Sequence, residues 1–320
     1  MYLNKSSVCL ITGGTGLVGR NLANGLKKRR LKKIILTNSK MYDLTKMNEC
    51  YKMFKKFKPT IVYNFAAKVG GILDNKKFPA DYYFHNTMIS TNIFECSKIF
   101  KIKKLINVGA GCGYPLNIKE PLKEEQIFNG LPQEESLPYS MSKKMIFVAS
   151  QAYKKQYDLN SISVIPSNIY GKFDNFNLDA SHVIPALLRK FHEAVRYNKK
   201  KVEIWGDGSA KRDFIYAEDF TNSLIKLTNT YNSTKPLNIC TGKQYSIKII
   251  ANDLKKISGF KGKIFWNTKM PSGAKSRKFS TINLEKNLGK GFKKFKNVRE
   301  GMKISYMWLE NNYNKKTTRL

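Results

Sequence analysis

Short apolar runs alternate with longer amphipathic stretches through the first half of the chain. The apolar runs occupy residues 8–11, 33–37, 60–65, 104–108 and 161–165. The stretches between them repeat apolar residues at helical spacing and cover 17–30, 47–57, 83–99 and 139–157. Strands that alternate with helices form βαβ units, whose strands lie parallel in one sheet. The pattern therefore predicts an α/β fold with a doubly wound parallel sheet.

After Pro166 the regular alternation ends. Helices are expected at 182–197, 218–228 and 246–257, and strands at 202–205, 214–216 and 237–239. The polar segment 311–320 is expected to fray. We predict a first domain at 1–170, to which a segment of about 213–242 returns, and a smaller interleaved α/β domain formed mainly by 171–320.

A glycine-rich loop follows the first apolar run and precedes the first predicted helix. The spacing of Gly13, Gly16 and Gly19 suits a tight turn, close approach of the backbone to a pyrophosphate, and tight packing of helix on strand. The helix N-terminus adds free N–H groups for the phosphates. The sequence therefore predicts a Rossmann-type dinucleotide site, and the alternative is an ordinary glycine turn. The residues of the site are Gly13, Gly14, Thr15, Gly16, Leu17, Val18 and Gly19.

The residues after the second strand bear on the choice of dinucleotide. NAD-binding folds usually place an acidic residue there to bind the ribose 2′-hydroxyl. Here the chain reads Thr37-Asn38-Ser39-Lys40, and the first acid is Asp43. Lys40, with Asn38 and Ser39, can receive a 2′-phosphate, which favours NADP(H). The alternative is NAD(H), with Lys40 as one more surface lysine.

Tyr139 and Lys143 are four residues apart at the start of a predicted helix, so they share one face. An ammonium beside a phenol stabilises the phenolate and lets the hydroxyl exchange a proton at neutral pH. The pair lies just before a predicted strand, well after the glycine loop. We interpret it as a catalytic pair.

These features together resemble the extended short-chain dehydrogenase/reductases, a family of NAD-dependent epimerases and dehydratases. Further stretches resemble the GDP-L-fucose synthases within that family. They are 66–72 (AAKVGGI), 112–115 (CGYP), 166–171 (PSNIYG), 174–176 (DNF) and 181–194 (SHVIPALLRKFHEA). The resemblance extends from the first strand to about residue 310.

The resemblance implies one site that epimerises C3 and C5 of GDP-4-keto-6-deoxy-D-mannose and reduces C4 with NADPH, giving GDP-L-fucose. It implies that Tyr139 protonates the C4 oxygen and that Lys143 holds Tyr139 and the nicotinamide ribose. Cys112 and His182 would be the acid–base pair of the epimerisation, because thiol and imidazole both exchange protons near neutral pH. Without the resemblance, Cys112 reads as a buried structural thiol and His182 as a helix cap.

The resemblance also implies the ligand contacts. Asn168 and His182 would border the cofactor together with Lys143. Because a guanidinium binds oxyanions in a fork, Arg212 suits a diphosphate. The alternative is that these residues are ordinary surface charges of loops and contact no ligand. The implied contacts of the sugar nucleotide are Asn168, Arg189, Lys190, Trp205, Arg212 and Arg277. A homodimer packed through the predicted helices 83–99 and 139–157 is implied as well.

One position departs from the family pattern. Ala110 stands where the family has a serine that helps to polarise the C4 carbonyl. Alanine cannot donate this hydrogen bond, and the loss of one such donor can cost on the order of 10²–10³ in rate. Another NDP-sugar epimerase, a 4-ketoreductase or a dehydratase of the same family is therefore an alternative. The alternative outside enzymes is a basic nucleotide-binding protein that contacts RNA.

Composition changes this picture little. The formal net charge is +35, but the lysines are spread along the chain, so we expect no nucleic-acid partner; a positive surface attracts an anionic sugar nucleotide. The five dispersed cysteines lack metal-ligand spacing and predict a reducing, cytoplasmic setting and no metal. No apolar run approaches the ~18–20 residues that span a bilayer, and the first run leads into a glycine loop, so we expect neither membrane association nor a signal peptide.

Overall fold

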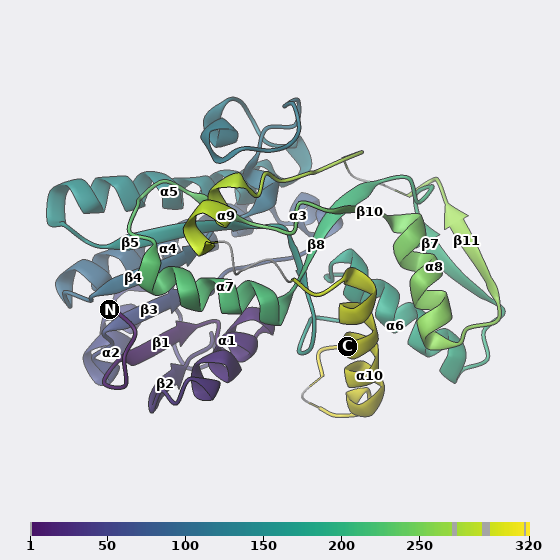
Figure 1. The fold of residues 1–320 in the computed structure, drawn as a ribbon, viewed down its shortest axis with the longest axis horizontal. Helices are drawn as coiled ribbons and strands as arrows, with labels where there is room; N and C mark the ends of the chain where they lie inside the picture. Colours follow the sequence, from purple (N-terminus) through teal and green to yellow (C-terminus); the bar gives the residue numbers. More distant parts are fainter. Residues whose placement is uncertain (1, 271–273, 290–294, 317) are drawn as a thin grey trace.

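The computed structural model describes residues 2–270, 274–289, 295–316 and 318–320. The largest sheet consists of β1 Val8–Thr12, β2 Lys33–Leu36, β3 Ile61–Asn64, β4 Lys104–Val108, β5 Ser161–Pro166 and β9 Leu237–Ile239. These six strands are all parallel, in the order β2-β1-β3-β4-β5-β9 (Figure 1). Their carboxyl ends therefore lie at one edge of the sheet, where ligands of open α/β sheets bind.

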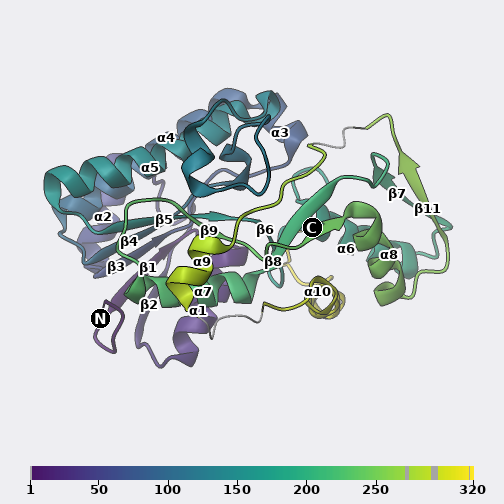
Figure 2. The same cartoon turned by 45° about the horizontal axis from the view of Figure 1, so that its top comes forward.

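Helices cover both faces of this sheet (Figure 2). One face carries α1 Leu17–Lys28, α7 Ala217–Thr230 and α9 Ile282–Leu288, and the other α2 Met47–Phe57, α4 Pro79–Ile99 and α5 Leu137–Tyr157. Alternate residues of a strand point to opposite faces, so Cys9 and Ile11 join the core under α1 and α7, whereas Leu10 joins the core under α2 and α4. The apolar runs of the sequence are continuous because both faces are buried.

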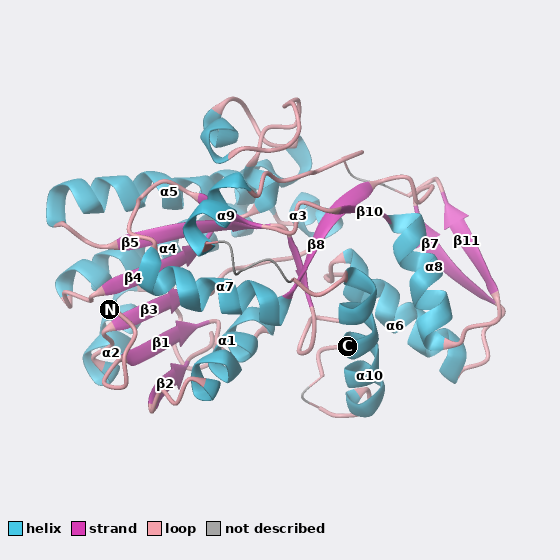
Figure 3. Ribbon diagram, in the orientation of Figure 1, coloured by secondary structure: helices cyan, strands magenta, loops and turns pink. Residues whose placement is uncertain are grey.

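The second part of the molecule lies beyond the carboxyl edge of the large sheet (Figure 3). It contains a sheet of β6 Asn168–Tyr170, β8 Lys211–Tyr216 and β10 Gln244–Ser246, and a parallel pair of β7 Lys201–Trp205 and β11 Lys263–Asn267. Its helices are α6 Val183–Arg196, α8 Ile247–Ser258 and α10 Val298–Asn312, which pack around one apolar core. A short helix, α3 Ile72–Lys77, precedes α4. Within the described ranges no helix combines the length and apolar character that a bilayer crossing needs.

The predicted fold class is confirmed: a doubly wound parallel sheet with smaller sheets beside it. The predicted domain limits stay a prediction, although β9 does return to the large sheet beside β5. Sequence analysis missed α3, α9, α10 and the strands β6, β10 and β11. Its expectation of a frayed end was wrong for described residues of that segment, because α10 reaches Asn312 and the Arg319 carbonyl accepts a hydrogen bond from the Phe176 N–H at 2.7 Å.

Candidate active site

The glycine loop joins β1 to α1 at the carboxyl edge of the sheet. Gly13 has a φ of +63°, and a Cβ built there would lie 2.8 Å from the carbonyl carbon of Phe65. A Cβ on Gly19 would lie 2.6 Å from the Cα of Gly14. Neither position has room for a side chain, so the path of the loop requires both glycines.

Gly16 is the residue before α1 and is less crowded than its neighbours. The nearest atom to a Cβ built there would be the Gly13 carbonyl oxygen, at 3.3 Å. The first N–H groups of a helix lack acceptors within the helix, so those of Leu17, Val18 and Gly19 are available to an anion. The narrow glycine loop and this helix start together fit the pyrophosphate of a dinucleotide. Thr15 is exposed in the same loop.

The turn after β2 lies beside the glycine loop, since the Gly14 N–H donates to the Thr37 carbonyl at 2.8 Å. Asn38 Oδ1 accepts hydrogen bonds from the N–H groups of Lys40 and Met41, at 3.0 and 3.2 Å. Lys40 is exposed in this turn. The carboxylate of the first acid, Asp43, is already engaged, because it accepts from the N–H and the hydroxyl of Thr45.

Tyr139 and Lys143 lie one turn apart at the start of α5. The ring of Tyr139 packs edge-on against Tyr82 of α4, with centroids 5.9 Å apart and an interplanar angle of 88°. Burial, and next the negative charge available at Cys112, raise the pKa of Tyr139. The phenol therefore keeps its proton at neutral pH and is available as an acid.

Lys143 is buried, and its ammonium makes no hydrogen bond to any described residue. Burial lowers its pKa to about 8, and the charge of Cys112 acts in the opposite direction. The group is therefore mainly charged at neutral pH.

Cys112 lies in a 3₁₀ turn, Gly111–Gly113, that follows β4. Its sulfur accepts a hydrogen bond from the Ser140 hydroxyl at 3.3 Å. Burial raises the pKa of Cys112, while Ser140 and the positive charges of Arg277 and Lys143 lower it. The structure thus brings Cys112, Tyr139 and Lys143 into one site.

His182 is the residue immediately before α6, and its imidazole makes no capping hydrogen bond. The residue is exposed to solvent. Partial desolvation by the surrounding protein lowers its pKa, so the ring is mainly neutral at pH 7. It can therefore accept a proton, and once protonated it is a strong enough acid to return one.

Asn168 and Arg212 stand on neighbouring strands of the smaller sheet. The Asn168 amide donates to the Asp213 carbonyl at 2.9 Å, which ties β6 to β8. The buried carboxylate of Asp213 accepts hydrogen bonds from Thr241 and Gly242. These bonds hold in place the strand that carries Arg212.

Arg212 and Arg277 lie close enough for their charges to interact. Burial and the charge of Arg277 lower the pKa of Arg212 to about 10, and Glu120 offsets part of this effect. Arg277 donates to the carbonyls of Tyr114 and Pro115, both at 3.2 Å. Two partly buried guanidinium groups that repel each other favour binding of a polyanion between them.

The remaining predicted contacts already have partners elsewhere. Arg189 pairs with Glu193 at 2.6 Å and donates to the Phe176 carbonyl, so its guanidinium holds α6 in place rather than joining Arg212. Lys190 donates to the Glu203 carbonyl at 2.9 Å and lies 5.6 Å above the ring of Trp205. Trp205 ends β7 and is 38% exposed, so its ring can still stack on a ligand.

Three residues that sequence reasoning missed also belong to this region: Ser140, Tyr82 and Glu120. Ser140 contacts Cys112, Tyr82 contacts Tyr139, and Glu120 interacts with both Arg212 and Arg277. Only Ser140 carried a signal, namely its place beside Tyr139 in the chain. The other two come from loops and helices whose approach depends on the fold.

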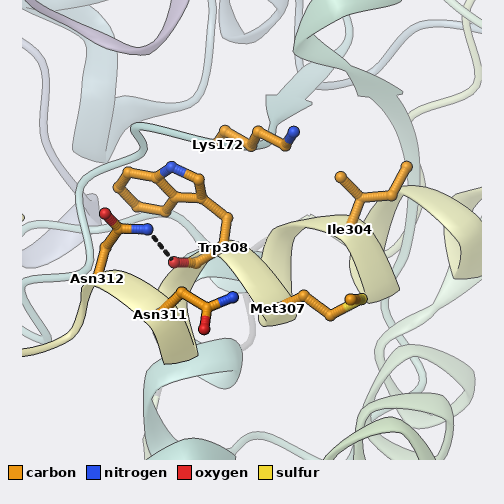
Figure 4. Close-up of a pocket in the computed structure, with 6 residues that line it drawn as sticks. All are labelled: Lys172, Ile304, Met307, Trp308, Asn311 and Asn312. Atoms are coloured by element: carbon orange, nitrogen blue, oxygen red, sulfur yellow. Dashed lines mark hydrogen bonds between the residues drawn. The ribbon is translucent and has the colours of Figure 1, made fainter.

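A pocket of about 320 Å³ lies elsewhere, on α10 (Figure 4). Its lining residues are Lys172, Ile304, Met307, Trp308, Asn311 and Asn312. It is shallow and contains none of the predicted catalytic or ligand-binding residues. The site at the carboxyl edge of the large sheet is therefore the better candidate for chemistry.

Comparison with known proteins shows the family of the chain. The sequence pattern of the NAD dependent epimerase/dehydratase family matches residues 9–240. A GDP-L-fucose synthase of Sinorhizobium fredii is 37% identical over 284 residues, which cover 89% of this chain and 90% of that protein.

Two solved structures extend the likeness to the whole fold. A GDP-L-fucose synthetase from Naegleria fowleri bound to NADP superposes with a TM-score of 0.93 at 28% identity, covering 100% of this chain and 98% of that one. A GDP-6-OMe-4-keto-L-xylo-heptose reductase from C. jejuni gives a TM-score of 0.90 at 31% identity, covering 97% and 99%.

Proposed function

This chain belongs to the NAD dependent epimerase/dehydratase family, as a nucleotide-sugar epimerase/reductase, and on that premise we propose its reaction. The enzyme epimerises C3 and C5 of GDP-4-keto-6-deoxy-D-mannose and reduces the C4 ketone with NADPH, giving GDP-L-fucose. The observation that carries the proposal is the thiol of Cys112 beside the Tyr139/Lys143 pair. A reductase needs the phenol and the ammonium, whereas a thiol at the reacting carbon serves proton exchange.

The cofactor fits the residues around the glycine loop, and it supplies the hydride when bound. Leu17, Val18 and Gly19 would hold the pyrophosphate through their N–H groups, and Lys40 would receive the 2′-phosphate. Tyr139 donates its proton to the C4 oxygen as negative charge develops there. A phenol with a raised pKa is a suitable donor, because an alkoxide is far more basic. Lys143, one turn away, stabilises the phenolate that remains.

Epimerisation at each carbon breaks one C–H bond and forms another on the opposite face. The electron pair of the broken bond moves onto the C4 oxygen, where Tyr139 donates a hydrogen bond. One of Cys112 and His182 takes the proton, and the other returns one. Before turnover the side chains of Cys112 and His182 are both mainly neutral. Whichever of the two takes the proton from carbon, one stage of the cycle therefore has Cys112 as a thiolate and His182 as an imidazolium.

Arg212 and Arg277 bind the diphosphate of the sugar nucleotide in this proposal. Their mutual repulsion falls when an anion lies between them, so the free energy of that relief adds to binding. The charge of Arg277 also acts on Cys112, so the diphosphate and the reacting sugar lie at neighbouring places. Trp205 and Asn168 complete the substrate contacts.

The test incubates the protein with GDP-4-keto-6-deoxy-D-mannose and NADPH in deuterated water. We expect NADPH oxidation, GDP-L-fucose by NMR, and deuterium at both C3 and C5. Cys112→Ser should abolish the inversion at C3 and C5, and Tyr139→Phe should abolish the reduction while deuterium exchange continues. A folded wild-type protein that neither oxidises NADPH nor exchanges deuterium would refute the proposal.

A second candidate is a 4-ketoreductase without epimerisation. The C. jejuni heptose reductase, alike in fold and 31% identical, supports it. Ala110 in place of the family serine also points away from a standard member. NADPH oxidation without deuterium at C3 or C5 would favour this candidate over the first.

We also propose a homodimer packed through α4 and α5. These two helices lie side by side, and each presents exposed apolar side chains, among them Tyr83 and Phe84 on α4 and Met145 and Val148 on α5. Covering such a surface favours association. Phe84→Lys should convert a dimer to a monomer in sedimentation velocity, and a wild-type monomer would contradict the proposal.

A further inference from the structure

Ser140 lies between the two catalytic elements, next to Tyr139 in the chain and against Cys112 in space. Its side chain is fully buried, and its oxygen is 3.3 Å from the Cys112 sulfur. A buried hydroxyl that points at a sulfur has given up its bond to water, so the contact replaces solvent as its partner.

A second hydroxyl continues the contact. The oxygens of Ser136 and Ser140 are 3.3 Å apart, and Ser136 also lies 3.4 Å from the Gln133 carbonyl. A thiolate can only accept hydrogen bonds, so in that state Ser140 must donate to Cys112. The Ser140 oxygen can then accept the single proton of Ser136, which donates to it instead of to the Gln133 carbonyl. The two hydroxyls thus align toward the sulfur when it is charged.

The other charged or titratable groups that act on Cys112 are two cations and a phenol. Arg277, from the loop before α9, and Lys143, from α5, favour its negative charge. Tyr139 lies on the same turn of α5 and stays neutral near pH 7, because its pKa is raised. Burial opposes the charge. A further cation near Cys112 would compete for the diphosphate of the substrate, whereas a neutral donor stabilises the thiolate without doing so.

We propose that Ser140 is a positioning residue that donates a hydrogen bond to Cys112 and stabilises the negatively charged form of its sulfur. Its purpose in turnover rests on the proposed function, since both directions of proton exchange pass through the thiolate. The contact itself does not depend on that function. Removing the Ser140 hydroxyl should therefore raise the pKa of the Cys112 thiol even without substrate.

Ser142 provides the matched control. It is also buried in α5, but its hydroxyl donates to the Tyr139 carbonyl at 2.7 Å, an ordinary bond within the helix. Ser142→Ala and Ser140→Ala each remove one buried hydroxyl, at positions two residues apart in α5. A general loosening of α5 would affect both variants alike, whereas loss of the bond to sulfur affects only one.

The first readout is alkylation of the folded protein by iodoacetamide across a pH series. The other four cysteines, Cys9, Cys50, Cys96 and Cys240, are each 0% exposed, so Cys112 should react alone. Iodoacetamide reacts with the thiolate, so the profile gives the pKa of Cys112. Ser140→Ala removes a hydrogen bond to a charged sulfur, and the usual strength of such a bond predicts that the pKa of Cys112 rises by about one unit. Alkylation at low pH should then be about tenfold slower.

Ser142→Ala should leave the profile unchanged, and Ser136→Ala should shift it in the same direction by less. Coincident profiles for wild type and a folded Ser140→Ala would overturn the proposal. Equal shifts in Ser140→Ala and Ser142→Ala would overturn it as well.

The second readout separates the two half-reactions. Ser140→Ala should lower deuterium exchange at C3 and C5 by about tenfold, and leave reduction of an already epimerised 4-keto sugar nucleotide unchanged. Equal loss in both half-reactions would contradict a role through Cys112. If wild type exchanges no deuterium, the proposed function fails, but the alkylation profile still decides the contact between Ser140 and Cys112.

Discussion

Lys143 should set the upper pH limit of the proposed reduction. The ammonium must be charged to stabilise the phenolate of Tyr139. Burial lowers its pKa from the ordinary 10.5 to about 8. The charged form is therefore present below about 8 and is lost as the pH rises through that value, so the rate should fall far below the pH at which an ordinary lysine titrates.

The size of the fall follows from the titration itself. One unit above the pKa of Lys143, about one enzyme molecule in eleven keeps the charge, so kcat/KM should be roughly tenfold lower at that pH than at neutral pH. The assay follows NADPH oxidation with an already epimerised 4-keto substrate, so that epimerisation does not limit the rate. The quantity to plot is kcat/KM, because it reports the free enzyme.

Cys112→Ser tests the cause of this limit. The pKa of Cys112 is raised, so its thiol is mainly protonated where Lys143 titrates and adds little charge there. A serine of similar size does not ionise, so the falling limb should stay in place if Lys143 sets it. Cys96→Ala, which alters a buried thiol between α2 and α4, should leave the limb in place. A wild-type profile level up to the ordinary lysine pKa, or a limb that disappears in Cys112→Ser, would refute the reasoning.

Four further changes test separate parts of the site. Ala110→Ser restores a hydroxyl donor near the C4 oxygen and should raise kcat for reduction, by up to about a hundredfold in the NADPH assay; an unchanged kcat would mean that no donor is needed there. Lys40→Ala should weaken NADPH about tenfold and leave NADH unchanged in fluorescence titrations, because only NADPH carries the 2′-phosphate. Arg212→Lys should raise KM for the sugar nucleotide about tenfold with little change in kcat, since a point charge replaces a fork; a fall in kcat alone would contradict a binding role. Lys104→Met should cost about 1–3 kcal/mol in urea unfolding because it leaves buried acceptors unpaired, whereas Lys143→Met should cost no stability while abolishing reduction.

The sequence was most informative where burial is complete and local spacing carries the chemistry. Strands β1, β3, β4 and β5 were predicted within about a residue or two at each end, because strands covered on both faces read as continuous apolar runs. The glycine loop after β1 and the one-turn spacing of Tyr139 and Lys143 on α5 were predicted because this geometry is set by residues near in the chain. Local spacing fixed these features before the fold was known.

The sequence was least informative where contacts join distant segments. The bond from Ser140 to Cys112 spans 28 residues and depends on the 3₁₀ turn after β4. The strands β6 and β10 have three residues each, too few to show a period. Arg189 is different: Glu193 lies four residues later on α6, a spacing that predicts an ion pair, and that signal was not used.

The buried lysines distinguish a structural cation from a functional one. Among the described lysines, Lys104, Lys143 and Lys144 are buried. Lys104 donates to the Tyr231 carbonyl and to Asn232, and Lys144 donates to the Gly130 carbonyl at 3.1 Å.

Hydrogen bonds to these acceptors replace the hydration that Lys104 and Lys144 lose on burial, so both cations stabilise the fold. Lys143 has no such acceptor among the described residues, and burial opposes its charge. The Nζ atom of Lys143 is not among the fully buried polar atoms without a partner, so solvent still reaches its donors. In the proposed reaction the ribose of the cofactor would supply acceptors to this ammonium. An ammonium that the described residues leave without an acceptor is available to Tyr139 and the cofactor, which is what the proposed reaction requires of Lys143.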